Sequence, residues 1–259
     1  MGVLSELDVF YKNFQGEKFI IGRSHRKKPI YCFRIKKTDF PKIIVQYAIH
    51  AREYITTYLA MLQIEDFIMR GKVGTVYFIP AVNPDGIEIA ELKNPLYKAN
   101  DFGVDLNVNF DALWGTGREN VRRKSDCNFI GERPFSEPET RALRDFTLLI
   151  EPHSTLSYHS KGEEIYWEFF QGEKERNRDE KIAKILSEVT GYAVKLTPDS
   201  AGGYKDWCIS RLKIPSFTIE VGSDNLSHPI GKEYSKDVFI KNQDVITTLI
   251  ESVRREYEH

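Results

Sequence analysis

The chain has 259 residues, of which 41% are hydrophobic and 29% are charged, and its formal net charge is −1. The near-zero charge argues against nucleic acid as a main partner, because nucleic-acid-binding proteins usually present a basic face. No apolar run is long enough to span a membrane. We expect residues 1–259 to form one domain, since this is a common length for a large α/β domain.

Two features bear on the cellular compartment. The cysteines Cys32, Cys127 and Cys208 are odd in number and widely separated, which argues against a disulfide framework. Residues 1–20 lack the basic start and apolar centre of a secretory signal. We therefore expect a cytoplasmic protein, with association with the cell envelope as the alternative.

The first half of the chain alternates between helix and strand patterns. The expected elements are a helix over 4–15, strands over 19–23, 29–35 and 43–47, a helix over 54–70, and a strand over 75–80. The unbroken apolar character of residues 43–47 is typical of a central strand that is covered on both faces. From there to about residue 136 the chain is rich in Gly, Asn and Pro, and we expect a long, ordered, functional loop region.

The second half continues the alternation. Ser136, with Glu139 three residues later, forms a capping-box pattern, and Pro138 lies in the first turn of the predicted helix. The further elements are a strand over 155–158, a helix over 173–190, a strand over 193–196, a short helix over 204–211, a strand over 215–221, and a helix over 233–258. This alternation predicts a three-layer α/β/α sandwich around a mixed, mostly parallel, twisted sheet.

Four ionisable residues fall at the ends of predicted strands: His50, Glu53, His159 and Glu220. In open α/β sheets, sites form at the carboxyl ends of strands. Neutral imidazole and carboxylate are good ligands for Zn²⁺, and a catalytic zinc takes three of them from the protein. We therefore predict a zinc site made by the first three residues. The alternative is a surface turn with a solvated Glu53.

The carboxylate of Glu220 has a different expected role. It lies inside an apolar strand, where a carboxylate is costly unless it is paired or functional. A general base beside a metal-activated water would explain it, and an exposed strand tip is the alternative. Asp105 could accept a hydrogen bond from a ligand imidazole, and Asn107 could bind substrate. For both, the alternative is an Asx-rich turn. None of the other histidines, His25, His153, His228 and His259, is expected to be a ligand.

Several short motifs follow one another within residues 17–250: His50-x-x-Glu53, Asn83–Gly86, Asp105–Phe110, Ser157–Ser160, Gly202–Trp207 and Glu220. In this order they resemble the motifs of the zinc metallocarboxypeptidases of the carboxypeptidase A type. Two further segments, Trp114–Gly117 and Ser160–Glu163, make the chain most similar to the bacterial γ-D-glutamyl-diamino-acid peptidases of that family, which cut the peptide stems of peptidoglycan.

The resemblance implies a zinc-carboxypeptidase-like fold, one Zn²⁺ per chain on His50, Glu53 and His159, and Glu220 as general base and proton shuttle. It further implies that Asn107 contacts a substrate carboxylate and that Arg52 lines the substrate cleft. Lys98 stands where short bacterial members place the Arg that polarises the scissile carbonyl. A Lys is a point charge rather than a planar fork, so a looser contact to the oxyanion is expected.

Three positions are expected to make substrate recognition differ from that of typical carboxypeptidases. Val108 stands where carboxypeptidases have the Arg that clamps a terminal carboxylate, and its loss argues against plain removal of C-terminal residues. Pro198 occupies the position of the mobile tyrosine, with Tyr204 as a candidate substitute. Lys205 falls at the base of the side-chain pocket, where a cation should favour an anionic group, and a solvated lysine is the alternative.

These expectations converge on a zinc peptidase that cuts a muropeptide stem between γ-D-Glu and diaminopimelate. A zinc carboxypeptidase or a zinc deacylase or amidase on other small peptides or N-acyl amino acids is the alternative enzyme. A pseudo-enzyme that binds peptide without cutting it is the alternative from another class.

Overall fold

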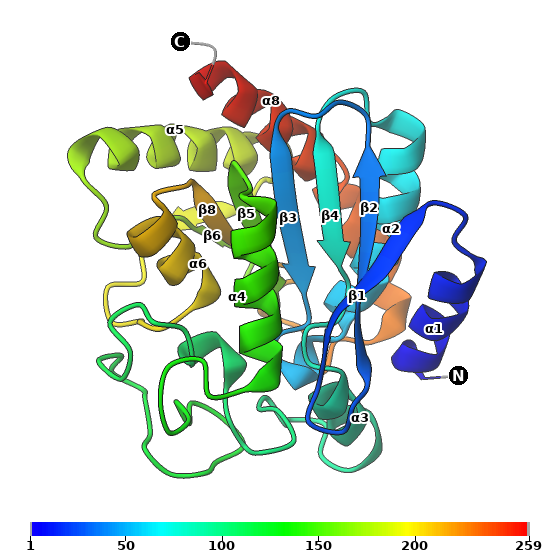
Figure 1. Ribbon diagram of the computed structural model, residues 1–259, viewed down its shortest axis with the longest axis vertical. Helices are drawn as coiled ribbons and strands as arrows, with labels where there is room; N and C mark the ends of the chain where they lie inside the picture. Colours follow the sequence, from blue (N-terminus) through cyan, green and yellow to red (C-terminus); the bar gives the residue numbers. More distant parts are fainter. Residues whose placement is uncertain (1, 258–259) are drawn as a thin grey trace.

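A computed structural model describes residues 2–257 of the chain. Within this range one sheet of eight strands runs through the molecule in the order β1-β2-β4-β3-β5-β8-β6-β7, with helices on both faces (Figure 1). Its strands are β1 Glu17–Arg23, β2 Pro29–Lys36, β3 Lys42–Tyr47, β4 Thr75–Ile79, β5 Ser154–His159, β6 Glu164–Tyr166, β7 Ala193–Lys195 and β8 Ser216–Glu220.

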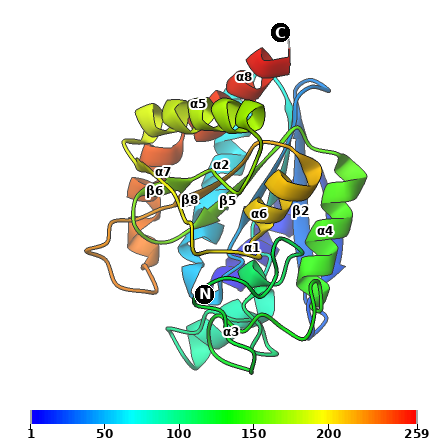
Figure 2. The ribbon, with the colours of Figure 1, turned by 90° about the vertical axis from the view of Figure 1, so that its left-hand side faces the viewer.

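The helices form the two outer layers of the sandwich. They are α1 Val3–Asn13, α2 Ile55–Arg70, α3 Pro84–Leu92, α4 Pro138–Ile150, α5 Glu173–Thr190, α6 Tyr204–Trp207, α7 Ser235–Asn242 and α8 Val245–Tyr257, with a π-helical turn at Cys208–Leu212 and 3₁₀ turns at Ala51–Glu53, Leu106–Val108 and Lys232–Tyr234. Figure 2 shows α4 and α6 on one side of the sheet and α2, α5 and α7 on the other. No helix among residues 2–257 is both long and apolar enough to cross a bilayer.

The central strands bury both faces, as their unbroken apolar sequence predicts. Successive side chains of a strand point to opposite faces, so Val45 and Tyr47 of β3 join the core that contains residues of α2, whereas Ile44 joins the core that contains residues of α4. These three side chains have no exposed surface. The predicted three-layer sandwich around a mixed sheet is therefore confirmed.

The register of the parallel strands gathers the predicted site residues at one edge of the sheet. β3 pairs in parallel with β5, and β5 pairs in parallel with β8. His159 and Glu220 are register partners at the ends of β5 and β8, and Tyr47, three residues before His50, is the partner of Tyr158. The chain therefore leaves β3, β5 and β8 at neighbouring points, which places their terminal side chains around a common space.

Three local predictions differ from the structure. The loop-rich region contains the helix α3, because Asn83 caps it by accepting a hydrogen bond from the Gly86 amide while Pro84 occupies its first turn. The C-terminal helix is broken into α7 and α8, and Arg70 of α2 holds the break by donating to the Asp244 carboxylate and the Gln243 carbonyl. The short strand β6 was not expected at all.

The start of α4 also differs from the capping-box prediction. Glu137, not Ser136, is the N-cap residue, and no side chain caps the helix. The Ser136 hydroxyl instead donates a hydrogen bond of 2.6 Å to Oε1 of Glu137. The sequence pattern located the helix start to within one residue, but the polar side chains there are used for contacts outside the helix.

Candidate metal centre and substrate cavity

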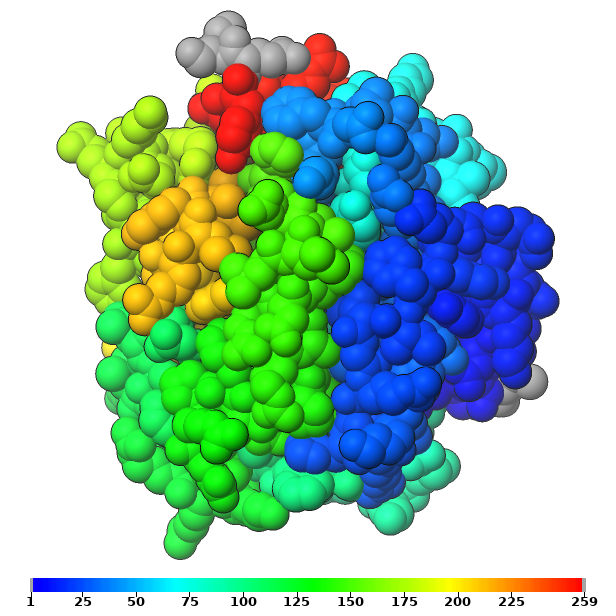
Figure 3. Space-filling view, viewed as in Figure 1, coloured from blue at the N-terminus to red at the C-terminus, as the bar shows by residue number. Residues whose placement is uncertain are grey.

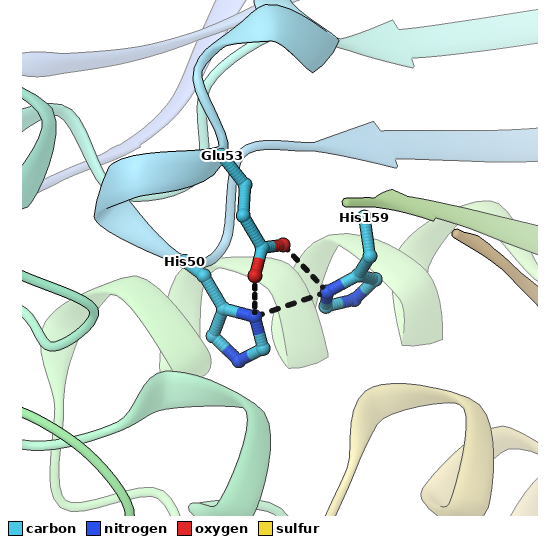
Figure 4. Close-up of side chains that lie close together, drawn as sticks. All are labelled: His50, Glu53 and His159. Atoms are coloured by element: carbon cyan, nitrogen blue, oxygen red, sulfur yellow. Dashed lines mark hydrogen bonds and ion pairs between the residues drawn. The ribbon is translucent and has the colours of Figure 1, made fainter. Parts of the chain in front are cut away.

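His50, Glu53 and His159 converge at the carboxyl end of the sheet (Figure 4). A 3₁₀ turn, Ala51–Glu53, follows β3, and residues three apart on such a turn lie on the same side, so His50 and Glu53 face the same point. His50 Nδ1 lies 2.9 Å from Glu53 Oε1, and His159 Nδ1 lies 3.0 Å from Glu53 Oε2. The two Nδ1 atoms are 3.1 Å apart, and all three residues are buried.

The hydrogen bond of His50 Nε2 indicates whether the opposite nitrogen, Nδ1, can bind a metal. His50 Nε2 lies 3.1 Å from Oδ1 of the fully buried Asp105. An ionised carboxylate can only accept, so Nε2 carries the ring proton and Nδ1 of a neutral imidazole keeps its lone pair. That lone pair faces the Glu53 carboxylate, and a cation bound between them would satisfy both groups. Two imidazoles and one carboxylate around one point are ligands that suit Zn²⁺, so the residues fit the metal.

Asp105 also contacts Lys98. Its Oδ2 atom lies 2.8 Å from Lys98 Nζ, and Lys98 donates a longer bond of 3.3 Å to the Asn128 side chain. Burial opposes ionisation of Asp105, but the charge of Lys98 and the hydrogen bond from His50 hold the pKa of this carboxyl well below its usual range. Lys98 therefore neutralises the carboxylate that orients His50, and it lines the cavity described below as well.

Glu220 lies beside His159 and outside the three-residue cluster. Desolvation by the surrounding protein raises the pKa of Glu220 to about 8; the charge of Glu53 adds to this effect, while His159 and Lys98 oppose it. In its ionised form, a carboxylate with a raised pKa is a stronger proton acceptor, which is the property that a general base needs.

A polar cavity of about 500 Å³ opens over these residues. Its lining includes His50, His159 and Glu220 together with Lys98 and Asn107. A larger hollow of about 920 Å³ lies between α1 and α2 and contains none of the predicted site residues. The smaller cavity is therefore the candidate substrate site.

Asn107 is held with its amide nitrogen available. Its side-chain oxygen accepts a hydrogen bond of 3.2 Å from the Tyr204 amide, so the oxygen and nitrogen positions are distinguished. Its backbone N–H donates to Asp105 Oδ1 at 3.0 Å. No hydrogen bond among residues 2–257 involves the Asn107 side-chain nitrogen, which leaves a donor for a ligand in the cavity that this residue lines.

Two residues expected at the cleft lie elsewhere. Arg52 does not line the cavity, and its guanidinium donates to the Leu96 carbonyl at 3.4 Å. The Arg52 charge nevertheless acts on Lys98, which does line the cavity. Tyr204 cannot replace the mobile tyrosine, because it is fully buried and its hydroxyl is hydrogen-bonded to Thr147 at 2.8 Å.

Lys205 reaches the cavity but is not a free cation. Its Nζ atom lies 2.6 Å from Asp206 Oδ1 and donates to the Glu168 carbonyl at 2.9 Å. Both Lys205 and Asp206 are buried and line the cavity. The alternative of a solvated lysine is therefore wrong, and the sequence did not indicate that the lysine charge is opposed by Asp206. The pocket instead presents an ion pair, with one lysine proton left to donate.

The cavity has a further wall residue that the sequence did not indicate. Tyr166 of β6 lines it beside Thr218, its register partner on β8. Its hydroxyl donates to Glu164. β6 is only three residues long, too short for an alternation pattern to be recognised, and its position depends on pairing with β8.

Known proteins match both the sequence and the fold. The zinc carboxypeptidase family matches residues 12–249. Gamma-D-glutamyl-L-diamino acid endopeptidase 1 of Lysinibacillus sphaericus is 30% identical over 268 residues, which cover 90% of this chain and 66% of that protein. The chain thus spans about two thirds of the length of this relative.

Two solved structures share the fold. Bovine thrombin-activatable fibrinolysis inhibitor, in complex with tick carboxypeptidase inhibitor, has a TM-score of 0.86 at 20% identity, over 99% of this chain and 98% of that one. Murein-tripeptide amidase MpaA from Escherichia coli O157 has a TM-score of 0.64 at 21% identity, over 93% and 92%. The family match extends over nearly the whole chain and includes the residues that converge around the zinc-compatible point. The chain belongs to the zinc carboxypeptidase family, whose metal is Zn²⁺.

Proposed function

We propose that this chain is a zinc peptidase that hydrolyses an amide bond in peptidoglycan stem peptides, between γ-D-Glu and diaminopimelate. The observation that carries the proposal is the cluster His50, Glu53 and His159 at the wall of a cavity that also contains Glu220. The choice of substrate is supported by the 30% identity to a γ-D-glutamyl-L-diamino acid endopeptidase.

In this proposal His50, Glu53 and His159 hold the zinc. When bound, Zn²⁺ supplies a Lewis acid that activates water and polarises the scissile carbonyl. Glu220 takes the proton of the attacking water on its carboxylate and delivers it to the leaving amine. Desolvation raises the pKa of Glu220, which makes its ionised carboxylate a better acceptor for the proton of water. Asp105 keeps the ring proton of His50 on Nε2, so that Nδ1 is free to be a ligand.

Lys98 and Asn107 each keep a donor that can bind the substrate. Lys98 keeps part of its hydrogen-bonding capacity, since two of its three protons are directed to Asp105 and Asn128. We assign the third Lys98 proton to a hydrogen bond with the scissile carbonyl oxygen, on which negative charge develops during the reaction. The free amide nitrogen of Asn107 is assigned to a carboxylate or carbonyl of the substrate.

Specificity is assigned to the pocket floor. Val108 lines the cavity and offers no charge for a terminal carboxylate. The remaining proton of Lys205 can bind the side-chain carboxylate of diaminopimelate, which lysine lacks. Recognition then depends on the side chain of the leaving residue rather than on the end of the chain.

The test is to incubate the zinc-loaded protein with defined tri- and tetrapeptide stems and identify the products by mass spectrometry. Release of a diaminopimelate-containing fragment from γ-D-Glu is expected, and the Glu220→Gln protein is the matched negative control. Parallel incubations with C-terminal dipeptide substrates and N-acyl amino acids examine the carboxypeptidase and deacylase alternatives. Turnover of these compounds with intact stems would reject the peptidoglycan assignment.

A further inference from the structure

The loop over residues 101–108 carries Asp105 and Asn107, and two fully buried asparagines flank it. Asn100 precedes the loop and Asn109 follows it. Both make hydrogen bonds to the turn before α4, which lies at the lower end of that helix in Figure 1. Figure 3 shows this loop region and α4 in green, with the β1–β2 hairpin in blue beside them.

Asn100 fastens the first half of the loop. Its side-chain oxygen accepts hydrogen bonds from the amides of Phe102 and Val104, both at 3.0 Å. Its side-chain nitrogen donates to Glu137 Oε2 at 2.7 Å. The asparagine thus transmits the position of the Glu137 carboxylate to the backbone one residue before Asp105.

Asn109 fastens the other end to the same carboxylate. Its side-chain nitrogen lies 3.0 Å from Ser136 Oγ and shares its two protons among this atom and the Ile130 and Arg133 carbonyls, at 2.8 and 3.0 Å. Its side-chain oxygen accepts from Thr140 Oγ1 at 2.8 Å. Ser136 Oγ in turn donates to Glu137 Oε1 at 2.6 Å. The two oxygens of Glu137 therefore receive one connection from each end of the loop.

His25 completes the shell of Glu137. Its Nε2 atom lies 2.7 Å from Glu137 Oε2, and its ring stacks on Phe102 of the same loop at a centroid distance of 3.8 Å. Glu137 is only 5% exposed, so its hydrogen bonds are shielded from water. Bonds to a buried carboxylate are stronger than those between neutral groups.

His25, Glu137 and Glu139 could together suggest a second metal site, because their ligand atoms lie within 4.8 Å of one another. The hydrogen bonds exclude it. Asn100 Nδ2 lies 2.7 Å from Glu137 Oε2 and 3.4 Å from Glu139 Oε2, so N–H groups occupy the space between the carboxylates. Because the Asn100 oxygen is bound to two backbone amides, the amide group cannot turn round to offer it.

We propose that Glu137 is a positioning residue for the metal centre. Its carboxylate fixes both ends of the 101–108 loop and so directs Asp105 at Nε2 of His50, which determines the tautomer of a zinc ligand. Glu137 touches neither metal nor substrate, and the inference concerns metal binding, whichever substrate is cut.

The experiment measures the dissociation constant for Zn²⁺ by competition with a chromogenic chelator. Glu137→Gln keeps the size of the side chain but places an N–H₂ group against His25, Asn100 or Ser136. Substitutions around a metal ligand typically reduce affinity about 10–100-fold, and we expect about 10-fold here. Glu139→Gln is the matched control, since Glu139 lies on the same turn and reaches the loop only through the 3.4 Å contact, and its affinity should stay within twofold of wild type.

A double-mutant cycle separates positioning from a general loss of structure. If Glu137 acts through Asp105, Glu137→Gln should have no further effect on Zn²⁺ affinity in an Asp105→Asn background. The visible spectrum of the Co²⁺-loaded protein, which reports ligand geometry, should change in Glu137→Gln and not in Glu139→Gln. Should Glu137→Gln fail to fold, Ser136→Ala, which removes one of the two connections, is measured instead. Wild-type affinity in the folded variant, or additive effects in the cycle, would overturn the proposal.

Discussion

Among residues 2–257, imidazole and carboxylate groups form two clusters, and the protons are arranged oppositely in the two. Around His50, Glu53 and His159, the partner of His50 is an acceptor, Asp105, so the ring proton is drawn to the far side and lone pairs face one another. Around His25, Glu137 and Glu139, the partners are donors, Asn100 and Ser136, so the carboxylate oxygens are already occupied. Residue type alone would not distinguish the two clusters.

What a His–Glu cluster can do depends on the hydrogen-bond partners of its histidines and carboxylates. An acceptor that binds the far nitrogen of a histidine leaves the near nitrogen free to be a metal ligand. Donors between carboxylates instead give a hydrogen-bonded structural cluster, here called the brace, which consists of His25, Glu137 and Glu139. The brace has a cost at Glu139, which is fully buried and whose partners are the His25 amide at 3.3 Å and Asn100 at 3.4 Å. Burial raises the pKa of Glu139 to about 7.

The largest expected effect is loss of zinc when a histidine of the metal cluster is replaced, with no loss when His25 of the brace is replaced. His159→Ala should lose both bound zinc and activity, because two protein ligands are too few for a catalytic zinc site. His25→Ala should keep about one zinc per chain. Metal analysis after gel filtration measures both, and stoichiometric zinc in His159→Ala together with wild-type turnover would refute the ligand assignment.

The next effect separates chemistry from metal binding. Glu220→Gln keeps the size of the side chain but cannot take a proton, so kcat should fall by roughly 10²–10⁴-fold. The zinc content should stay near one per chain, since Glu220 lies outside the cluster of ligands. Steady-state kinetics with metal analysis of the same sample decide the matter, and a normal kcat would remove Glu220 from the mechanism.

The third effect concerns the brace. The pKa of Glu139 rises from 4.5 to about 7 on folding, so its contribution to stability is fully present below about pH 4.5 and is lost as the pH rises through 7. Gln imitates the protonated acid, so Glu139→Gln should match wild type near pH 4 and exceed it above pH 7. The shift corresponds to a difference of at most about 3 kcal/mol in the free energy of unfolding.

Urea unfolding at pH 4.5, 6 and 8 measures this difference. Besides Glu139, the groups that share the cluster are His25 and Glu137, so the comparison is made as a difference between variant and wild type at each pH. The exposed Glu132, substituted by Gln, is the control and should show no such trend. A difference that does not grow with pH would contradict a raised pKa for Glu139.

The smallest effect tests the ion pair in the pocket floor. Because Asp206 and the Glu168 carbonyl already use two protons of Lys205, a substrate carboxylate gains one hydrogen bond, worth about 0.5–1.5 kcal/mol. Stems with diaminopimelate should be cut about threefold to tenfold faster than stems with lysine, measured as kcat/KM. Lys205→Ala should narrow this ratio, and an unchanged ratio would exclude Lys205 as its cause.

The site residues were predicted best where a local sequence pattern, such as a turn or an apolar strand, fixes the position of the side chain. His50 and Glu53 lie on one tight turn, and His159 and Glu220 end strands whose apolar sequence places them in the centre of the sheet, so their meeting follows from strand order. Asp105 was expected behind a ligand imidazole, and it lies 3.1 Å from His50. Tyr166 could not be predicted, because its three-residue strand forms only by pairing with β8 and β7, which lie far away in the sequence.

By itself, the sequence determined the α/β class, the strand ends that carry the zinc-compatible residues, and the family, because periodicity and motif order are local properties of the chain. Only the tertiary structure decided that Arg52 donates to the Leu96 carbonyl, that Lys205 is paired with Asp206, and that Glu137 accepts a hydrogen bond from the loop. The physical reason is that a charged or polar group acts according to the partners that fill its hydrogen bonds. At Glu137 these partners come from the β1–β2 hairpin, the loop before Asp105 and the turn before α4, which no local pattern brings together.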